Sequence, residues 1–143
     1  MAVPFQVTFD CADPAAQAAF WAAALDCIVQ PPPEGYADWP SFLSAHGITI
    51  AADAASAVVD PEGKGPRVFF QRVPEPKTAK NRMHLDLNVS ETRRVGPEEG
   101  HRRVDAAVER LVGLGAAKVR VCDENGEYWT VMQDPEGNEF CVQ

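Results

Sequence analysis

The sequence lacks the features that direct a protein to a membrane or to nucleic acid. No apolar run approaches the roughly 20 residues of a membrane-spanning helix, and the first residues do not combine basic side chains with an apolar stretch of signal-peptide length. Basic residues are in the minority, 13 against 21 acidic ones, for a formal net charge of −8. Such a surface repels phosphate backbones and anionic lipid. We therefore expect a cytoplasmic protein that binds neither nucleic acid nor a membrane.

Paired cysteines are also absent. Cys11, Cys27, Cys122 and Cys141 are scattered, without a Cys-x-x-Cys pair. This spacing is typical of small, buried apolar side chains in a reducing compartment. It argues against disulfide bonds and against a zinc knot.

The chain begins with the pattern of a strand followed by a helix. Residues 5–11 alternate between apolar and polar, as a strand with two different faces does. Asp13 is then a helix N-cap, and Pro14 suits the first helical position. The alanine-rich run from there to Leu25 has a high helix propensity.

The rest of the first half indicates further strands. The pattern blurs after Ile28, where we expect short strands at residues 42–43 and 48–51. A turn then leads into residues 67–73, which are rich in strand-forming side chains. Residues 74–82 are polar and proline-rich, and they resemble a solvated linker.

The second half repeats this order. A strand over residues 84–89 is followed by a helix with apolar residues at i, i+4, i+7 and i+8, and Asn125-Gly126 predicts a hairpin before a final strand at residues 138–142. The apolar helix residues are Val104, Val108, Leu111 and Val112.

The tetrapeptide Asp-Pro-Glu-Gly occurs before the last strand of each half, at residues 60–63 and 134–137. Together with the shared order of elements, it indicates an internal repeat. A chain of 143 residues is long enough for one domain with a substantial core and too short for two large ones. The sequence therefore predicts an α+β fold: one domain, residues 1–143, made of two βαβββ modules, residues 1–76 and 77–143.

The alternating strands also predict a polar face opposite the helix in each module. Two readings remain open, because the face either lines a polar cleft or is simply in contact with water. The residues on it are Gln6, Thr8, Asp10, Phe69 and Gln71 in the first module and His84, Asp86, Asn88, Glu139 and Cys141 in the second.

The repeat and its motifs resemble the vicinal oxygen chelate superfamily, and within it the glyoxalase-like domains of the glyoxalase, bleomycin resistance protein and dioxygenase group. The resemblance is carried by "FDCADPAAQAAFWAAAL", "DPEGKGPRVFFQRVPEPKTAKNRMHLDLNV" and "YWTVMQDPEGNEFCVQ", and it covers essentially the whole chain. It implies two modules whose mixed sheets form a cup-shaped, barrel-like cleft. Members of the superfamily act as lyases, isomerases or dioxygenases there, often with a divalent metal, or they sequester a drug.

The resemblance also locates the metal-ligand positions, at the first and last strand of each module. They fall on Gln6, Phe69, His84 and Cys141. One imidazole, one thiol and one amide are a poor set for an oxygen-preferring divalent ion. We therefore expect no metal and no other cofactor, with zinc on His84, Cys141 and Glu139 as the alternative.

Without a metal, His84 and Glu139 are the candidate catalytic residues, because an imidazole among carboxylates can act as an acid or base near neutral pH. Strand geometry separates His84 from Asp86 by about 7 Å, so no direct hydrogen bond between them is expected. His46 and His101 are expected at the surface. The candidate ligand-binding residues are Gln6, Thr8, Asp10, Trp39, Phe69, Gln71, Asp86 and Cys141, with Trp39 in a lid.

The favoured function is the binding of a small organic molecule in the cleft between the modules. One alternative is a metal-dependent lyase, isomerase or dioxygenase, and another is a module without catalysis that serves structure or interaction. Pseudo-symmetric modules favour either closure within one chain or exchange in a homodimer.

Overall fold

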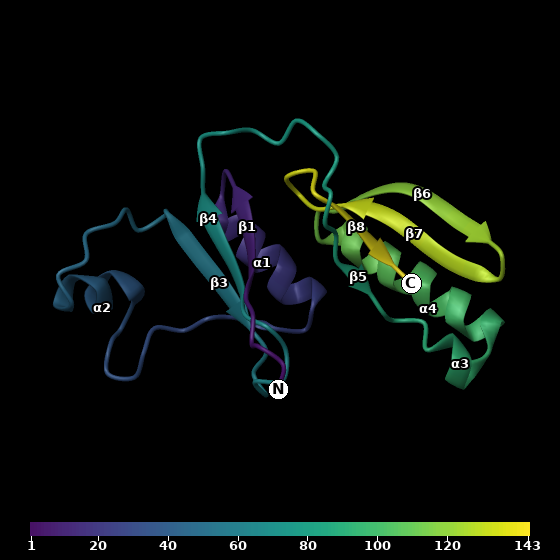
Figure 1. The fold of residues 1–143 in the computed structure, drawn as a ribbon, viewed down its shortest axis with the longest axis horizontal. Coiled ribbons are helices and arrows are strands. Elements are labelled where there is room, and N and C mark those ends of the chain that lie inside the picture. The colour runs from purple at the N-terminus through teal and green to yellow at the C-terminus, as the bar shows by residue number, and fades with distance from the viewer. The chain divides into compact units, whose positions relative to one another are not determined.

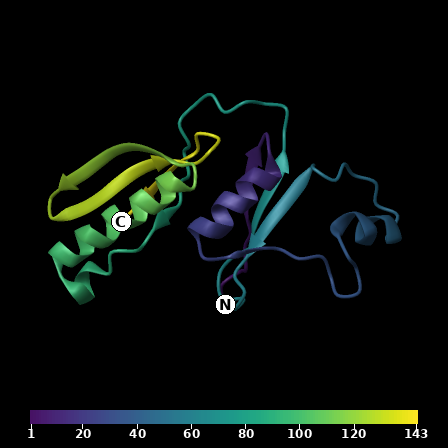
Figure 2. The ribbon, with the colours of Figure 1, turned by 180° about the vertical axis from the view of Figure 1, so that it is seen from behind.

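The computed structural model describes all of residues 1–143, which divide into two compact units, Met1–Pro76 and Lys77–Gln143 (Figures 1 and 2). Each unit contains one four-stranded sheet. No helix in either unit has the length and apolar character needed to cross a membrane. That the two units make a single domain stays a prediction.

The first unit has strands in the order β1-β4-β3-β2, with β1 parallel to β4 and the other pairs antiparallel. Helix α1 contacts β2, β3 and β4, and a second short helix, α2, interrupts the connection from β2 to β3. The elements are β1 (Val7–Cys11), α1 (Pro14–Ala24), β2 (Ile28–Val29), α2 (Trp39–Ala45), β3 (Ala55–Val59) and β4 (Val68–Arg72).

The second unit repeats this topology in the order β5-β8-β7-β6, again with the first and last strands parallel. The βαβββ repeat and the α+β class predicted from the sequence are thus confirmed. The elements are β5 (Asp86–Leu87), α3 (Thr92–Val95), α4 (Pro97–Gly113), β6 (Ala117–Glu124), β7 (Glu127–Gln133) and β8 (Glu139–Val142).

Aromatic packing fastens α1 to its sheet. The carboxylate of Asp13 accepts a hydrogen bond from the Ala16 backbone N–H at 3.1 Å and so caps the helix where the sequence predicts. Trp21 is fully buried, its ring 5.4 Å from that of Phe9, and Phe9 in turn stacks on Phe70 at 5.5 Å. These three rings join α1 to one face of β1 and β4.

Helix α4 covers the second sheet through residues spaced at helical intervals. Val104, Val108 and Leu111 are buried, as the sequence predicts, and the helix contacts β6, β7 and β8. Val112 was expected on the same side but is 46% exposed. One residue advances a helix by about 100°, so with Leu111 turned to the sheet Val112 lies to one side of the buried stripe.

Both Asp-Pro-Glu-Gly segments are turns of the same construction. In each, the aspartate side chain accepts the N–H of the glutamate two residues on, and the glycine has positive φ, 70° at Gly63 and 85° at Gly137. The surroundings differ, because Asp134 is only 3% exposed and also accepts bonds from the backbone and side chain of Asn138. The second turn is therefore part of a core, and the first is at the surface.

Two local predictions were wrong. The strands expected at residues 42–43 and 48–51 are replaced by helix α2 and an irregular segment. Asp38 caps α2 by accepting the Ser41 N–H at 2.8 Å, and a proline stands in the first turn of the helix. These residues are a helix start signal, but the strand-forming residues nearby favoured the wrong prediction. Phe5 was expected on the buried face but is 72% exposed, because β1 pairs only from Val7 onward.

The two turns allow a matched test of how much the burial of the aspartate contributes to the stability of the fold. We expect Asp134→Ala to lower the free energy of unfolding by about 2 kcal/mol, because it leaves partly buried N–H groups of Glu136 and Asn138 without an acceptor. Asp60→Ala removes a similar set of bonds to Glu62, Lys64 and Gly65 at the surface, so water replaces the carboxylate and the loss is smaller. Urea unfolding of both variants measures the difference, and equal losses would contradict it.

Candidate functional site

The parallel pairing of β1 and β4 assembles the polar face of the first sheet. Thr8 lies opposite Phe69, and Asp10 lies opposite Gln71, whose amide donates to the Asp10 carboxylate at 2.8 Å. These side chains lie on the face away from α1, because the residues between them, Phe9 and Phe70, pack towards the helix. Four of the predicted ligand-binding residues are thus neighbours on one surface.

Gln6 lies at the edge of this face, just before β1. Its side-chain N–H donates to the Thr8 hydroxyl at 3.2 Å, and its carbonyl oxygen accepts a bond from Nη1 of Arg67 at 2.6 Å. The oxygen that the family resemblance offers to a metal is therefore engaged with a cation.

Arg67 is a site residue that the sequence analysis missed. Its Nε donates to the Gln30 side-chain oxygen at 2.7 Å, and its guanidinium lies 4.9 Å from the centre of the Phe69 ring. Burial lowers the pKa of the guanidinium. The signal was available, since Arg67, Phe69 and Gln71 alternate along one strand and so share a face.

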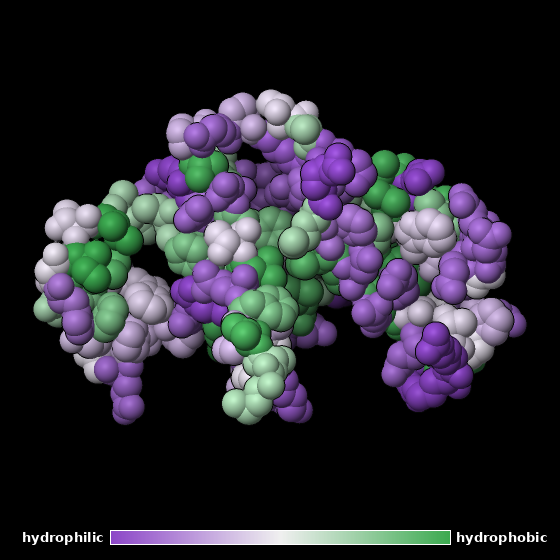
Figure 3. All heavy atoms as spheres, viewed as in Figure 1, coloured by the Kyte–Doolittle hydropathy of each residue, from purple (hydrophilic) through white to green (hydrophobic).

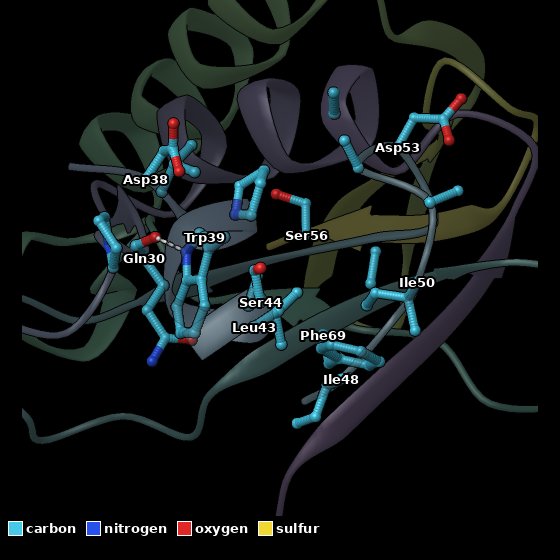
Figure 4. A pocket seen from close by; sticks show the side chains of 18 of the residues that line it. Gln30, Asp38, Trp39, Leu43, Ser44, Ile48, Ile50, Asp53, Ser56 and Phe69 are labelled. Carbon is cyan, nitrogen blue, oxygen red and sulfur yellow. Dashed lines mark hydrogen bonds between the residues drawn. The ribbon is translucent and has the colours of Figure 1, made fainter. Parts of the chain in front are cut away.

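A pocket of about 740 Å³ lies in the first unit, between this sheet and the segment that holds α2 (Figure 4). Trp39 lines it and is fixed by a bond from its indole N–H to the Gln30 carbonyl at 3.0 Å. Phe69 also lines it, and Figure 3 shows apolar residues at the surface near α2. Other lining residues include Leu43, Ser44, Ile48, Ile50, Asp53 and Arg67.

In the second unit, His84 lies beside Asp86 and Cys141. The bond between Nδ1 of His84 and Oδ1 of Asp86 is 2.6 Å long, so the expectation of no direct hydrogen bond was wrong. His84 precedes β5, which begins at Asp86, and its side chain reaches along the chain towards the carboxylate. Strand rise describes only the separation of backbones, not of side-chain ends.

Cys141 is the cross-strand partner of Asp86, and donor atoms of the three residues all lie within 4.8 Å of one another. Burial raises the pKa of the Cys141 thiol, and the negative charge of Asp86 raises it further. Because Thr8 pairs with Phe69 as Asp86 pairs with Cys141, Phe69 is the counterpart of Cys141.

Glu139 is held by the segment that precedes β5 and is not a member of this cluster. The Asn81 backbone N–H donates to its carboxylate at 2.8 Å, and the Lys77 ammonium lies 3.1 Å away. These two contacts lower the pKa of Glu139 to about 2. Lys77, expected in a solvated linker, instead forms a largely shielded ion pair.

The other two histidines take no part in the cluster. His46 is exposed, and its Nδ1 lies 2.8 Å from the Phe42 carbonyl in the last turn of α2. His101 stacks on Tyr128 with 4.0 Å between ring centres.

The four positions at which the superfamily holds a divalent metal do not fit such an ion here. Phe69 has no donor atom, and Gln6 already accepts a bond from Arg67. The raised pKa of Cys141 keeps its thiol protonated at neutral pH. Of the four positions, only His84 carries a side chain that is a good metal ligand.

The ion pair at Glu139 predicts a specific acid dependence of stability. A carboxyl with a folded-state pKa of about 2, against an ordinary value of 4.5, stabilises the fold above the ordinary value and loses that contribution as the pH falls towards the folded one. We expect the stability of Glu139→Gln to decline less steeply than that of the native protein across this window. Urea unfolding at several pH values measures it, with exposed Glu127→Gln as control; identical slopes for native protein and Glu139→Gln would contradict it.

Comparison with known proteins agrees with this topology. The pattern of the family described as "Glyoxalase-like domain" matches residues 6–143. No curated protein sequence matches the chain significantly.

Solved structures share the fold at low sequence identity. A glyoxalase/bleomycin resistance protein/dioxygenase family enzyme from Burkholderia phytofirmans is 16% identical with a TM-score of 0.61, covering 96% of this chain and 94% of its own. The fosfomycin resistance protein FosX from Listeria monocytogenes is 12% identical with a TM-score of 0.63, covering 100% and 90%. A possible glyoxalase from Bacillus cereus is 14% identical with a TM-score of 0.61, covering 100% and 99%.

The repeated βαβββ topology and a family match over nearly the whole chain lead to one conclusion: the chain belongs to the glyoxalase-like domain family.

Proposed function

We propose that this glyoxalase-like domain binds a small organic molecule in the pocket of its first unit. The observation that carries the proposal is the pocket itself, about 740 Å³ in volume and walled by Trp39 and Phe69. Ligand sites typically enclose about 300–1,000 Å³ and combine mostly apolar walls with a few placed polar groups. Gln30 and Arg67 are such groups, since both line the pocket and are fixed by hydrogen bonds.

A solved structure with the same fold supports the binding of a small organic molecule. The FosX structure holds Mn(II) and 1S,2S-dihydroxypropylphosphonic acid, a small organic molecule. The sequence analysis expected the ligand between the modules, whereas the pocket that supports the proposal lies wholly within the first. Of the expected contacts, Trp39 and Phe69 line it, and Gln6, Thr8, Asp10 and Gln71 remain proposed ligand contacts on the same sheet face.

If the domain is also a catalyst, we propose His84 as the group that moves a proton. The bond from Nδ1 to Asp86 fixes the ring and leaves Nε2 as the nitrogen that could exchange a proton. Glu139 is a weaker choice than the sequence suggested, because a carboxyl with a pKa of about 2 is ionised at neutral pH and is a poor proton acceptor.

A second candidate function, metal binding, is favoured by the cluster of His84, Asp86 and Cys141. Imidazole, carboxylate and thiolate are all ligands of zinc, and zinc would have to displace the proton that the raised pKa keeps on the Cys141 thiol. The cluster replaces the zinc set expected from the sequence, since Asp86 takes the place of Glu139.

Pocket binding is tested with N-phenyl-1-naphthylamine, a neutral apolar probe that fluoresces when it leaves water. We expect the native protein to bind it and Ile50→Glu to bind at least about tenfold more weakly, since a carboxylate on the wall removes apolar contact area. Ile50 lines the pocket and is 51% exposed, so its replacement spares the core. Val112→Glu places the same charge on α4 and leaves the affinity unchanged; equal affinities for all three proteins would refute the proposal.

The metal candidate predicts zinc binding near one ion per chain under reducing conditions, measured by competition with a chromophoric chelator. His84→Ala and Cys141→Ser should each weaken it at least about tenfold, because three ligands become two. His46→Ala removes a histidine outside the cluster and serves as control. Zinc affinity that is unchanged in both cluster variants would exclude this candidate.

A further inference from the structure

We propose that Arg67 makes the pocket of the first unit selective for organic acids, that is, for molecules with an apolar body and one negatively charged oxygen group. This inference rests on the proposed function and names the class of ligand. Arg67 lies in the pocket wall, beside the Phe69 ring.

The hydrogen bonds of Arg67 leave its charge uncompensated. Nε and Nη1 donate to the side-chain oxygens of Gln30 and Gln6, which are neutral amides. A guanidinium has five N–H donors, and these bonds use two of them. The two amides and the Phe69 ring therefore fix the orientation of the group while donors remain for a ligand.

The carboxylates that line the pocket are committed to other partners. Asp38 accepts the Ser41 backbone N–H and caps α2, and Asp53 forms an ion pair with Arg72. Neither bonds to Arg67. Besides the Asp38 carboxylate, which is held by the α2 backbone, the pocket thus presents one oriented cation among walls that include Leu43 and Ile48.

This combination favours an anion over a neutral molecule of the same shape. Hydrogen bonds between a guanidinium and a carboxylate, sulfonate or phosphonate are roughly twice as strong as neutral ones and are often bidentate. The apolar wall lowers the local dielectric constant and so strengthens the attraction. Apolar contacts with Ile48, Ile50 and Trp39 would hold the body of the ligand.

A purely structural role for Arg67 makes a different prediction. Arg67 ties β4 to Gln30, next to β2, and to Gln6, before β1, and this bracing alone would matter for stability but not for ligand charge. The test must therefore compare a charged and a neutral ligand that share the same apolar body, on the same protein.

The experiment displaces N-phenyl-1-naphthylamine from the native protein with 1-naphthoate or with 1-naphthalenemethanol, its neutral counterpart. We expect naphthoate to displace the probe at a concentration about tenfold lower than the alcohol, which is the gain of one good charged hydrogen-bond pair. In Arg67→Gln the ratio should fall to about one, and in Arg67→Lys, which keeps the charge, it should be intermediate. Lys64→Gln removes an exposed charge from the same unit and should leave the ratio unchanged.

The outcomes separate the two proposals. If the native protein binds the probe but naphthoate and the alcohol displace it at equal concentrations, the selectivity is overturned and the proposed function stands. This outcome needs no variant. Failure of the native protein to bind the probe overturns both. A ratio that stays near ten in a folded Arg67→Gln shows that Arg67 does not select the anion. If Arg67→Gln does not fold, the ratios measured for the native protein and for Arg67→Lys decide whether Arg67 selects the anion.

Discussion

The parallel pairing of the first and last strands of each unit is the constraint on which the rest of the structure depends. It joins residues about 60 positions apart, so that Thr8 lies beside Phe69 and Asp86 beside Cys141. On one side, α1 or α4 packs against the sheet through its own buried residues. Because strand side chains alternate, the same packing turns the remaining residues together on the opposite face. The candidate site is a consequence of that alternation.

The two units use this shared frame for different chemistry. In the first, Phe69 and Arg67 face a pocket that the segment with α2 walls on its other side. In the second, the counterpart of Phe69 is Cys141, and it joins a polar cluster with His84. Topology alone therefore does not determine what either face binds. The side chains at equivalent positions decide it, and they differ in charge, size and donor type.

Electrostatics separates the groups that are already satisfied from those that can act on a ligand. Glu139 is stabilised as a carboxylate by Lys77 and the Asn81 N–H, and the lowered pKa records that stabilisation. Arg67 has only neutral hydrogen-bond partners, and burial disfavours its charge. The charge of Glu139 is neutralised within its own chain, whereas Arg67 is held in one orientation and its charge is not neutralised. A difference of this kind distinguishes a structural ion pair from a ligand contact.

The sequence by itself determined the repeat, the α+β class and the faces of the first and last strand of each module, because helix caps, turn motifs and period-two alternation are local signals. Thr8, Phe69, Asp86 and Cys141 could be assigned to the site face for that reason. Only the tertiary structure decided that Arg67 contacts Gln6 and Gln30 and that Lys77 pairs with Glu139. These contacts join segments up to 62 residues apart. Local patterns do not encode them, since they depend on which side chains the folded backbone brings together.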